Sequence, residues 1–170
     1  TEAQKKFEEK DYEASEYKYS NLLGSSLPKS EMIKAIVGLG KCYLAQSKFD
    51  LLSELVENLE EDIKNEKDIK DLIKSKNYLE TIEASEISSL ETKLDNQPEN
   101  LEVRFELARG QIANKNYTEA INNLLYIIEK KKDWSNDKAK KELFEIFILL
   151  GDTHSLTIEG RKTLSNLIFK

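Results

Sequence analysis

The chain has 170 residues, including two prolines, six glycines and 34% charged residues, and its formal net charge is −6. The scarcity of proline and glycine, with abundant Leu, Ile, Lys, Glu and Ala, favours an all-helical chain. The mixed, acidic surface argues against nucleic acid as the main ligand, because phosphate binding needs a basic face.

The sequence also argues against a membrane protein and a secreted protein. The longest stretch without a charged residue runs from Tyr19 to Pro28, which is too short to span a bilayer. There is no secretory signal, and the single cysteine, Cys42, allows no internal disulfide. A lone cysteine fits a reducing compartment.

The N-terminal region predicts an incomplete helix pair. A helix is expected from Tyr12 to Leu23, but only residues 1–9 are present for its partner, which should need about a dozen. We therefore expect the chain to be a fragment of a longer protein.

The next segments predict a helix that starts after Ser30, a candidate N-cap, and a partner over residues 49–59. Residues 60–83 are rich in charge and sparse in apolar side chains. They predict one longer, solvated helix, with a disordered linker as the alternative. Ile87, Leu90 and Leu94 then predict a short helix that ends before Pro98.

Residues 101–128 carry the clearest pattern in the chain. Apolar residues recur at spacings of three and four on both sides of the polar turn 114–116, which indicates two amphipathic helices in a hairpin. Ala108 and Ala120 would lie where these helices approach most closely. A further apolar helix should end at Gly151, and a last one should span about Ser155 to Ile168.

The spacing of these elements indicates tetratricopeptide repeats, whose pattern is W-x2-L-G-x2-Y over 34 residues. Ile36-x2-Leu39-Gly40-x2-Tyr43 keeps the Leu-Gly-Tyr part of this pattern. An aromatic residue opens each second helix, at Tyr12, Phe49 and Tyr117. The 68 residues from Phe49 to Tyr117 are twice the period, so one degenerate unit should lie between them.

We therefore predict an all-α solenoid of about eight to ten helices in a single domain. Its approximate repeat units are residues 1–28, 29–62, 63–97, 98–132 and 133–170.

The sequence predicts no catalytic, cofactor-binding or metal-binding residues. Gly38-x-Gly40-Lys41 superficially resembles a phosphate loop, but it lies inside a predicted helix and lacks the other residues of that motif. Cys42 has no CxxC partner and is expected to be a packing residue. His154, the only histidine, has no companion ligands and is expected in a surface turn or helix cap.

A partner-binding groove is predicted along the first helices of successive repeats. The spacing that places residues on this face selects seven candidates: Lys34, Val37, Lys41, Leu44, Phe105, Arg109 and Ile112. The apolar members among them could instead be core, because a helix packed between neighbours buries two faces. Glu102 and Glu106 would repel a carboxylate, so they argue against a site here that binds the terminal carboxylate of a partner peptide.

The sequence resembles a known family over essentially its whole length, with the weakest similarity between Glu60 and Leu94. The resemblance is most specific after Asp133, and the 99–128 hairpin and the Lys10–Ala14 start also fit. The residues that carry it are Asp133, Trp134, Ala139, Lys140, Leu143, Phe147, Leu150, Gly151, Leu156, Thr157, Gly160, Arg161, Leu164, Leu167, Ile168 and Phe169. With these residues the chain resembles the C-terminal tetratricopeptide region of thioredoxin-like co-chaperones of the YbbN, or chaperedoxin, type.

The resemblance implies a bacterial cytoplasmic protein that holds unfolded clients and passes them to a folding chaperone. In that family a thioredoxin-like domain precedes the repeats, so any redox chemistry would belong to that domain, which is absent from these 170 residues. The alternative function is a generic tetratricopeptide scaffold that binds one partner peptide. An enzyme of unknown class is a distant third.

Overall fold

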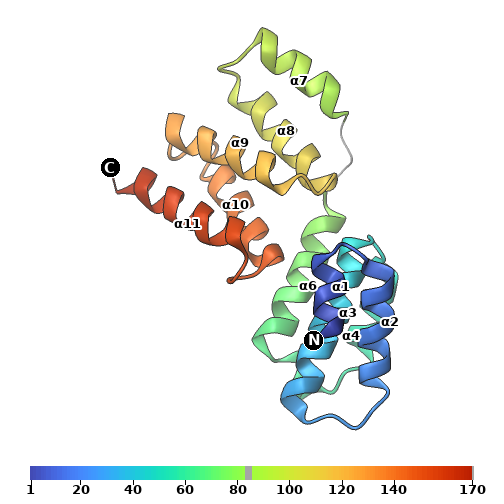
Figure 1. The fold of residues 1–170 in the computed structure, drawn as a ribbon. Helices are drawn as coiled ribbons and strands as arrows, with labels where there is room; N and C mark the ends of the chain where they lie inside the picture. The colour runs from blue at the N-terminus through green and yellow to red at the C-terminus, as the bar shows by residue number, and fades with distance from the viewer. Residues whose placement is uncertain (83–85, 170) are drawn as a thin grey trace. The chain divides into compact units, whose positions relative to one another are not determined.

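The structure is a computed structural model that describes residues 1–82 and 86–169. These residues form eleven α-helices and contain no β-strand (Figure 1). They group into two compact units, residues 1–77 and 78–170. The all-α prediction is confirmed, and the helix number exceeds the expected eight to ten. The five repeat boundaries proposed from the sequence stay a prediction.

The first unit contains the first five helices and most of the sixth. They are α1 (Glu2–Glu8), α2 (Tyr12–Leu23), α3 (Lys29–Ala45), α4 (Phe49–Glu57), α5 (Glu61–Lys64) and α6 (Lys67–Glu80). Helix α3 packs against α1, α2 and α4. This helix has more buried residues than any other helix of the unit: Ala35, Ile36, Leu39, Gly40, Cys42 and Leu44.

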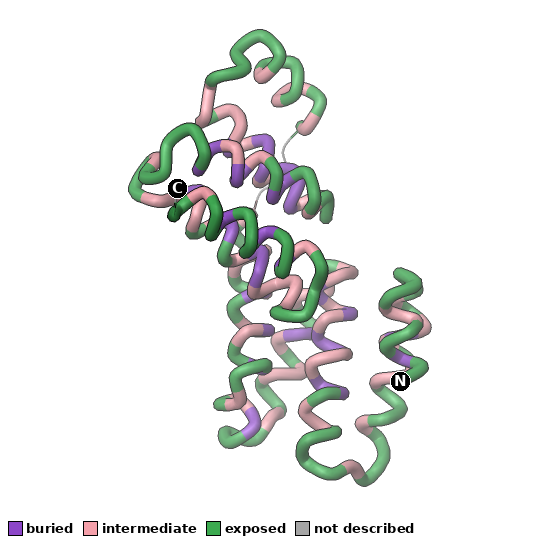
Figure 2. The backbone as a smooth tube through the Cα atoms, turned by 60° about the vertical axis from the view of Figure 1, so that its left-hand side comes forward, coloured by how far each residue is buried: buried purple, intermediate pink, exposed green. Residues whose placement is uncertain are grey.

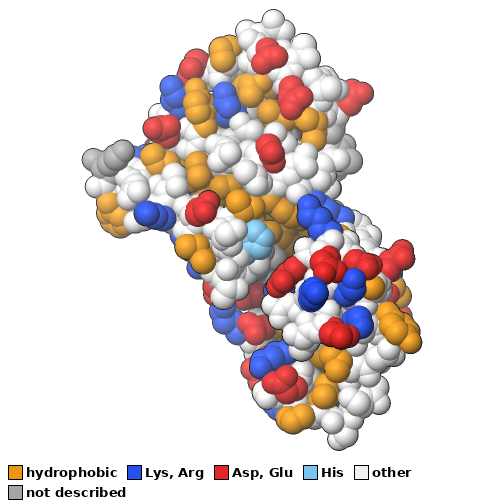
Figure 3. Space-filling view, viewed as in Figure 1, with side chains coloured by type: hydrophobic (Ala, Val, Ile, Leu, Met, Phe, Trp, Pro, Cys, Tyr) orange, Lys and Arg blue, Asp and Glu red, His pale blue; other side chains and the backbone are white. Residues whose placement is uncertain are grey.

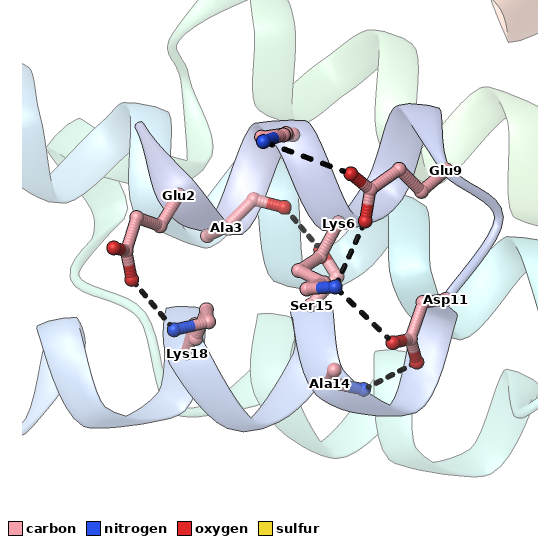
Figure 4. A network of polar contacts seen from close by, with 9 residues as sticks. Glu2, Ala3, Lys6, Glu9, Asp11, Ala14, Ser15 and Lys18 are labelled. Atoms are coloured by element: carbon pink, nitrogen blue, oxygen red, sulfur yellow. Dashed lines mark hydrogen bonds and ion pairs between the residues drawn. The ribbon is translucent and has the colours of Figure 1, made fainter.

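Polar contacts fix the first hairpin, between α1 and α2 (Figure 4). The buried Ser15 hydroxyl donates a hydrogen bond of 2.8 Å to the carbonyl of Ala3. At one end of the hairpin, Lys18 Nζ lies 2.7 Å from a Glu2 carboxylate oxygen. The Asp11 side chain caps α2 by accepting from the backbone N–H of Ala14. These contacts hold a short helix that has only one buried residue, Ala3.

Two glycines let neighbouring elements approach α3 closely. A Cβ atom on Gly38 would collide with the ring of Tyr19 from α2, and one on Gly40 would collide with Leu72 from α6. Gly38 and Gly40 therefore serve helix packing inside α3, and the Gly38–Lys41 segment lies within a helix, as predicted.

We expect Gly40→Ala to lower the free energy of unfolding by about 1–2 kcal/mol, because overpacking next to the buried Leu72 outweighs the gain in helix propensity. The measurement is urea denaturation followed by circular dichroism. Gly24→Ala is the matched control, since a Cβ there would lie no closer than 3.4 Å to the Asn21 carbonyl oxygen. A Gly40→Ala chain that is as stable as this control would contradict the prediction.

The second unit contains the end of α6 and five further helices. They are α7 (Ile87–Asn96), α8 (Leu101–Ala113), α9 (Tyr117–Lys130), α10 (Lys138–Leu150) and α11 (Ser155–Ile168). Helix α8 packs against α7 and α9, and α9 also packs against α10 and α11. Their buried apolar residues form one core, with Phe105, Leu124, Ile127, Leu143 and Ile146 among those with no exposed surface.

Three turns between paired helices share one backbone conformation. Lys10, Ser47 and Lys115 have φ values of 62°, 57° and 62°, in the left-handed region. In each turn the backbone N–H of the next residue donates a hydrogen bond of 2.8–3.0 Å to the carbonyl five residues before it. The donors are Asp11, Lys48 and Asn116. Helices α2, α4 and α9 begin at Tyr12, Phe49 and Tyr117, so the predicted aromatic openings are confirmed. The repeated geometry is a structural signature of repeats whose side chains have diverged.

None of these three left-handed positions is a glycine, although a side chain is disfavoured there. We expect Ser47→Gly to stabilise the chain by about 0.5 kcal/mol, because relief of the backbone strain exceeds the added flexibility of the unfolded chain. Ser47→Ala, which keeps a Cβ atom, should bring no gain. Thermal unfolding of both variants checks this, and a glycine variant that melts below the alanine variant would contradict it.

Two local predictions are wrong. Ser30 is not the N-cap of α3, because the helix already begins at Lys29 and the carbonyl of Pro28 accepts from the N–H groups of Glu31 and Met32. The segment predicted as one long helix over 60–83 forms α5 and α6 instead. Asn65 ends α5, and its side-chain amide donates to the Glu61 carbonyl at 2.8 Å. Residue 83 itself lies outside the described ranges.

Candidate functional site

Four of the seven predicted groove residues lie on α3. Lys34 is exposed and forms an ion pair of 2.9 Å with Glu31, one turn earlier. Val37 and Lys41 are half-buried. Val37 packs against the apolar cluster formed by Ile36, Ile63 and Ile69, and Leu44 is 5% exposed. On this helix Lys34, and in part Val37 and Lys41, remain accessible to a partner.

The other three lie on α8, in the second unit. Phe105 and Ile112 have no exposed surface. The Phe105 ring lies 5.3 Å from the Trp134 ring, and Lys138 Nζ lies 4.5 Å from its centre. Both side chains belong to the core in this structure and offer no surface to a partner. A groove role for the seven residues stays a prediction, and the burial of Leu44, Phe105 and Ile112 favours the alternative that these three are core.

Arg109 belongs to a polar cluster within the second unit. Its Nε atom lies 3.3 Å from a Glu142 carboxylate oxygen, and its terminal nitrogen donates to the Thr81 carbonyl at 3.1 Å. The same Glu142 oxygen accepts a 2.9 Å hydrogen bond from the Tyr78 hydroxyl. The cluster therefore links α8 and α10 to the last turn of α6 and the residue after it, and Arg109 is already engaged within the chain.

Burial dominates the electrostatics of this cluster. It raises the pKa of Glu142 from its ordinary value, although the Tyr78 hydrogen bond and the Arg109 charge act in the opposite direction. Two other charged groups act on Glu142 from α10 itself: Glu145 raises its pKa and Lys138 lowers it. Burial and the adjacent carboxylate also raise the pKa of Tyr78. These shifts arise because the Glu142 carboxylate is buried against Tyr78 and Arg109, between helices α6, α8 and α10.

A second polar network joins α8 to α9. The Arg104 guanidinium lies 3.8 Å above the Tyr126 ring and donates to the Asn123 side-chain oxygen at 2.9 Å. The Asn123 amide donates in turn to the buried Gln111, also at 2.9 Å. This network sets the register of the hairpin that the sequence pattern identified.

The residues considered for chemistry have structural roles. Cys42 is fully buried, its sulfur lies 3.3 Å from the Ser15 hydroxyl, and burial raises its pKa, which disfavours a reactive thiolate. His154 caps α11 by accepting from the Leu156 N–H, as predicted. Within the described residues no three potential metal ligands come together.

Exposed apolar side chains occur on the last two helices. Phe144 of α10 is 48% exposed and Ile158 of α11 is 57% exposed. On the face shown in Figure 3, acidic and basic side chains are interspersed rather than segregated. Phe144 and Ile158 are exposed enough to contact apolar partners.

Sequence analysis missed the Tyr78–Arg109–Glu142 cluster. The signal was present, because Glu142 lies three residues after the buried Ala139 and four before the buried Ile146, on the apolar side of α10. A charged residue on such a face predicts a buried partner. The identity of the residue that pairs with Glu142 depends on how the helices pack, and the sequence pattern does not specify this packing.

Comparison with known proteins identifies the class of fold. The family model for the tetratricopeptide repeat matches residues 80–169, which is more than half of the chain. The chain belongs to the tetratricopeptide repeat family. Repeats of this kind form protein-interaction scaffolds with extended binding surfaces.

Other comparisons add little to this assignment. A solved domain of a Vibrio parahaemolyticus protein of unknown function is 19% identical to the chain. The match covers 97% of this chain and 95% of that one, with a TM-score of 0.45. No curated protein matches the chain. In residues 1–82 and 86–169, no helix combines the length and apolar character that crossing a membrane requires.

Proposed function

We propose that the chain is the protein-binding repeat region of a thioredoxin-like co-chaperone that holds unfolded clients and docks a folding chaperone. The observation that carries the proposal is the tetratricopeptide match over residues 80–169, which includes the whole segment where the resemblance to YbbN-type co-chaperones is most specific. That family resemblance also supports a bacterial, cytoplasmic setting.

The exposed apolar side chains support holding rather than recognition of one sequence. Phe144 and Ile158 can contact apolar segments of an unfolded chain, and an apolar surface tolerates many client sequences. Charged neighbours of both signs keep this surface compatible with water. On α3, Lys34, Val37 and Lys41 remain candidates for contacts with a partner.

The experiment is suppression of client aggregation, measured by light scattering while a client protein unfolds in the presence of the chain. We expect suppression to increase with the amount of chain and to weaken in a Phe144→Ser, Ile158→Ser double variant. The matched control is Lys141→Ser with Glu159→Ser, which changes exposed neighbours on the same two helices. A folded chain that leaves aggregation unchanged would exclude the holding function.

The second candidate function is a scaffold for one specific partner peptide. It is favoured by the family assignment alone, because many tetratricopeptide repeats bind a defined segment. In that case the chain should not suppress aggregation, and it should bind one peptide with a stoichiometry of one to one in calorimetry.

A further inference from the structure

Helix α7 is the least buried long helix of the second unit. None of its residues is fully buried, and Figure 2 shows the helix, at the top of the view, without any buried segment. Its apolar stripe of Ile87, Leu90 and Leu94 is only half-buried. None of these three side chains joins the core or packs against it. The helix is therefore attached by one partly buried stripe.

The local sequence gives α7 little stability of its own. Its N-cap, Glu86, makes no capping hydrogen bond with its side chain. Within the described residues, its side-chain hydrogen bonds are local: Thr92 donates to the Ser88 carbonyl and Asn96 to the Thr92 carbonyl. Ser, Thr, Asp and Asn make up half of its ten residues and are weak helix formers. A helix of this length is marginal without packing.

Helix α7 covers one face of α8, against which it packs (Figure 1). Phe105, Ala108 and Ile112 of α8 face the core. At 100° per residue, Val103, Leu107 and Gly110 lie on the opposite side of the helix. Leu107 is nevertheless only 4% exposed, and Gly110 is buried. We assign α7 as a cover of this second apolar face.

We infer that α7 is a detachable helix that occupies, within its own chain, a docking surface for an amphipathic helix of a partner protein. The chemistry of that partner follows from α7 itself. Three half-buried apolar side chains recur at positions i, i+3 and i+7 on the helix that packs against α8, and exposed Glu91, Lys93 and Asp95 flank this stripe. A partner helix with the same stripe and stronger apolar contacts would replace it. This surface is separate from the exposed Phe144 and Ile158 used above.

Hydrogen exchange of the unaltered chain is the first test. Amides of residues 87–96 should exchange at least about 100-fold faster than those of α8 and α9, because α7 opens without unfolding the core. Equal protection of α7 and α8 would overturn the inference. This measurement needs no variant and is independent of client binding.

The second test uses a fluorescent synthetic peptide with the sequence of residues 86–97 as the probe. Leu90→Ser in the chain should release α7 and increase the affinity for the peptide by about tenfold or more, since the internal competitor is weakened. Glu91→Ser, on the exposed side of α7, is the matched control and should leave affinity unchanged. A peptide that itself carries Leu90→Ser should not bind.

Either of two results would overturn the inference. The first is equal binding of the peptide, or none, by the Leu90→Ser chain and the unaltered chain. The second is loss of the whole helical circular dichroism signal of the second unit in the Leu90→Ser chain, because α7 would then be an integral part of the core.

Discussion

Replacing Phe105 with serine is expected to lower the free energy of unfolding by about 4 kcal/mol, because the change removes a fully buried aromatic ring and leaves a cavity with a hydroxyl in it. The ring also loses its contact with Trp134. For a unit of this size the loss corresponds to a decrease in Tm of roughly 15 °C or more. Thermal unfolding monitored by circular dichroism measures it.

Phe144→Ser is the matched control for Phe105→Ser, because it changes the same residue type at a position that is 48% exposed. We expect a loss of less than about 1 kcal/mol for this control. If Phe105→Ser leaves the chain stable and weakens suppression of client aggregation, the core assignment is wrong and Phe105 acts in a groove.

Replacing Glu142 with alanine should lower the free energy of unfolding by about 3 kcal/mol, because it leaves the Arg109 charge and the Tyr78 hydroxyl without their shared acceptor. Glu142→Gln keeps an acceptor of the same shape for Tyr78 and should cost much less. Urea denaturation of both variants provides the comparison. Equal losses in the two variants would show that the acceptor oxygen is unimportant.

The same pair of chains gives a pH test. Because burial raises the pKa of Glu142 in the folded state, its contribution to stability is present at low pH and is lost as pH rises through the raised value. Glu142→Gln cannot titrate. Its stability relative to the unaltered chain should therefore rise as pH increases from the ordinary carboxyl pKa through the raised pKa of Glu142. A constant difference over this range would contradict the raised pKa.

The helix pairs could be predicted from the sequence because local signals agree with one another. Tyr12, Phe49 and Tyr117 follow short polar turns, and each begins a helix in the structure. Apolar spacing and turn residues act over a few residues, so no tertiary information is needed to place them. The break between α5 and α6 was missed because Asn65 ends a helix through a side-chain bond that charge-rich sequence does not reveal.

The candidate site could be predicted only in part. Periodicity selects the residues that share a helix face, but it does not say whether solvent or another helix covers that face. Phe105 and Ile112 were placed correctly on one stripe of α8, and the structure buries them. Arg109 was expected to meet a partner, whereas it pairs with Glu142 from a helix that begins about thirty residues later. Such pairings depend on how helices pack.

The way successive helices pack also bears on how fast the chain folds. Helix α2 packs against α1 and α3, and α9 against α8 and α10, so each contact closes a short loop. Closing short loops costs little chain entropy, and domains built from such local contacts fold in microseconds to milliseconds as an order of magnitude. Because the N-terminus emerges first from the ribosome, helices α1–α4 can therefore pair while α8–α11 are still being synthesised.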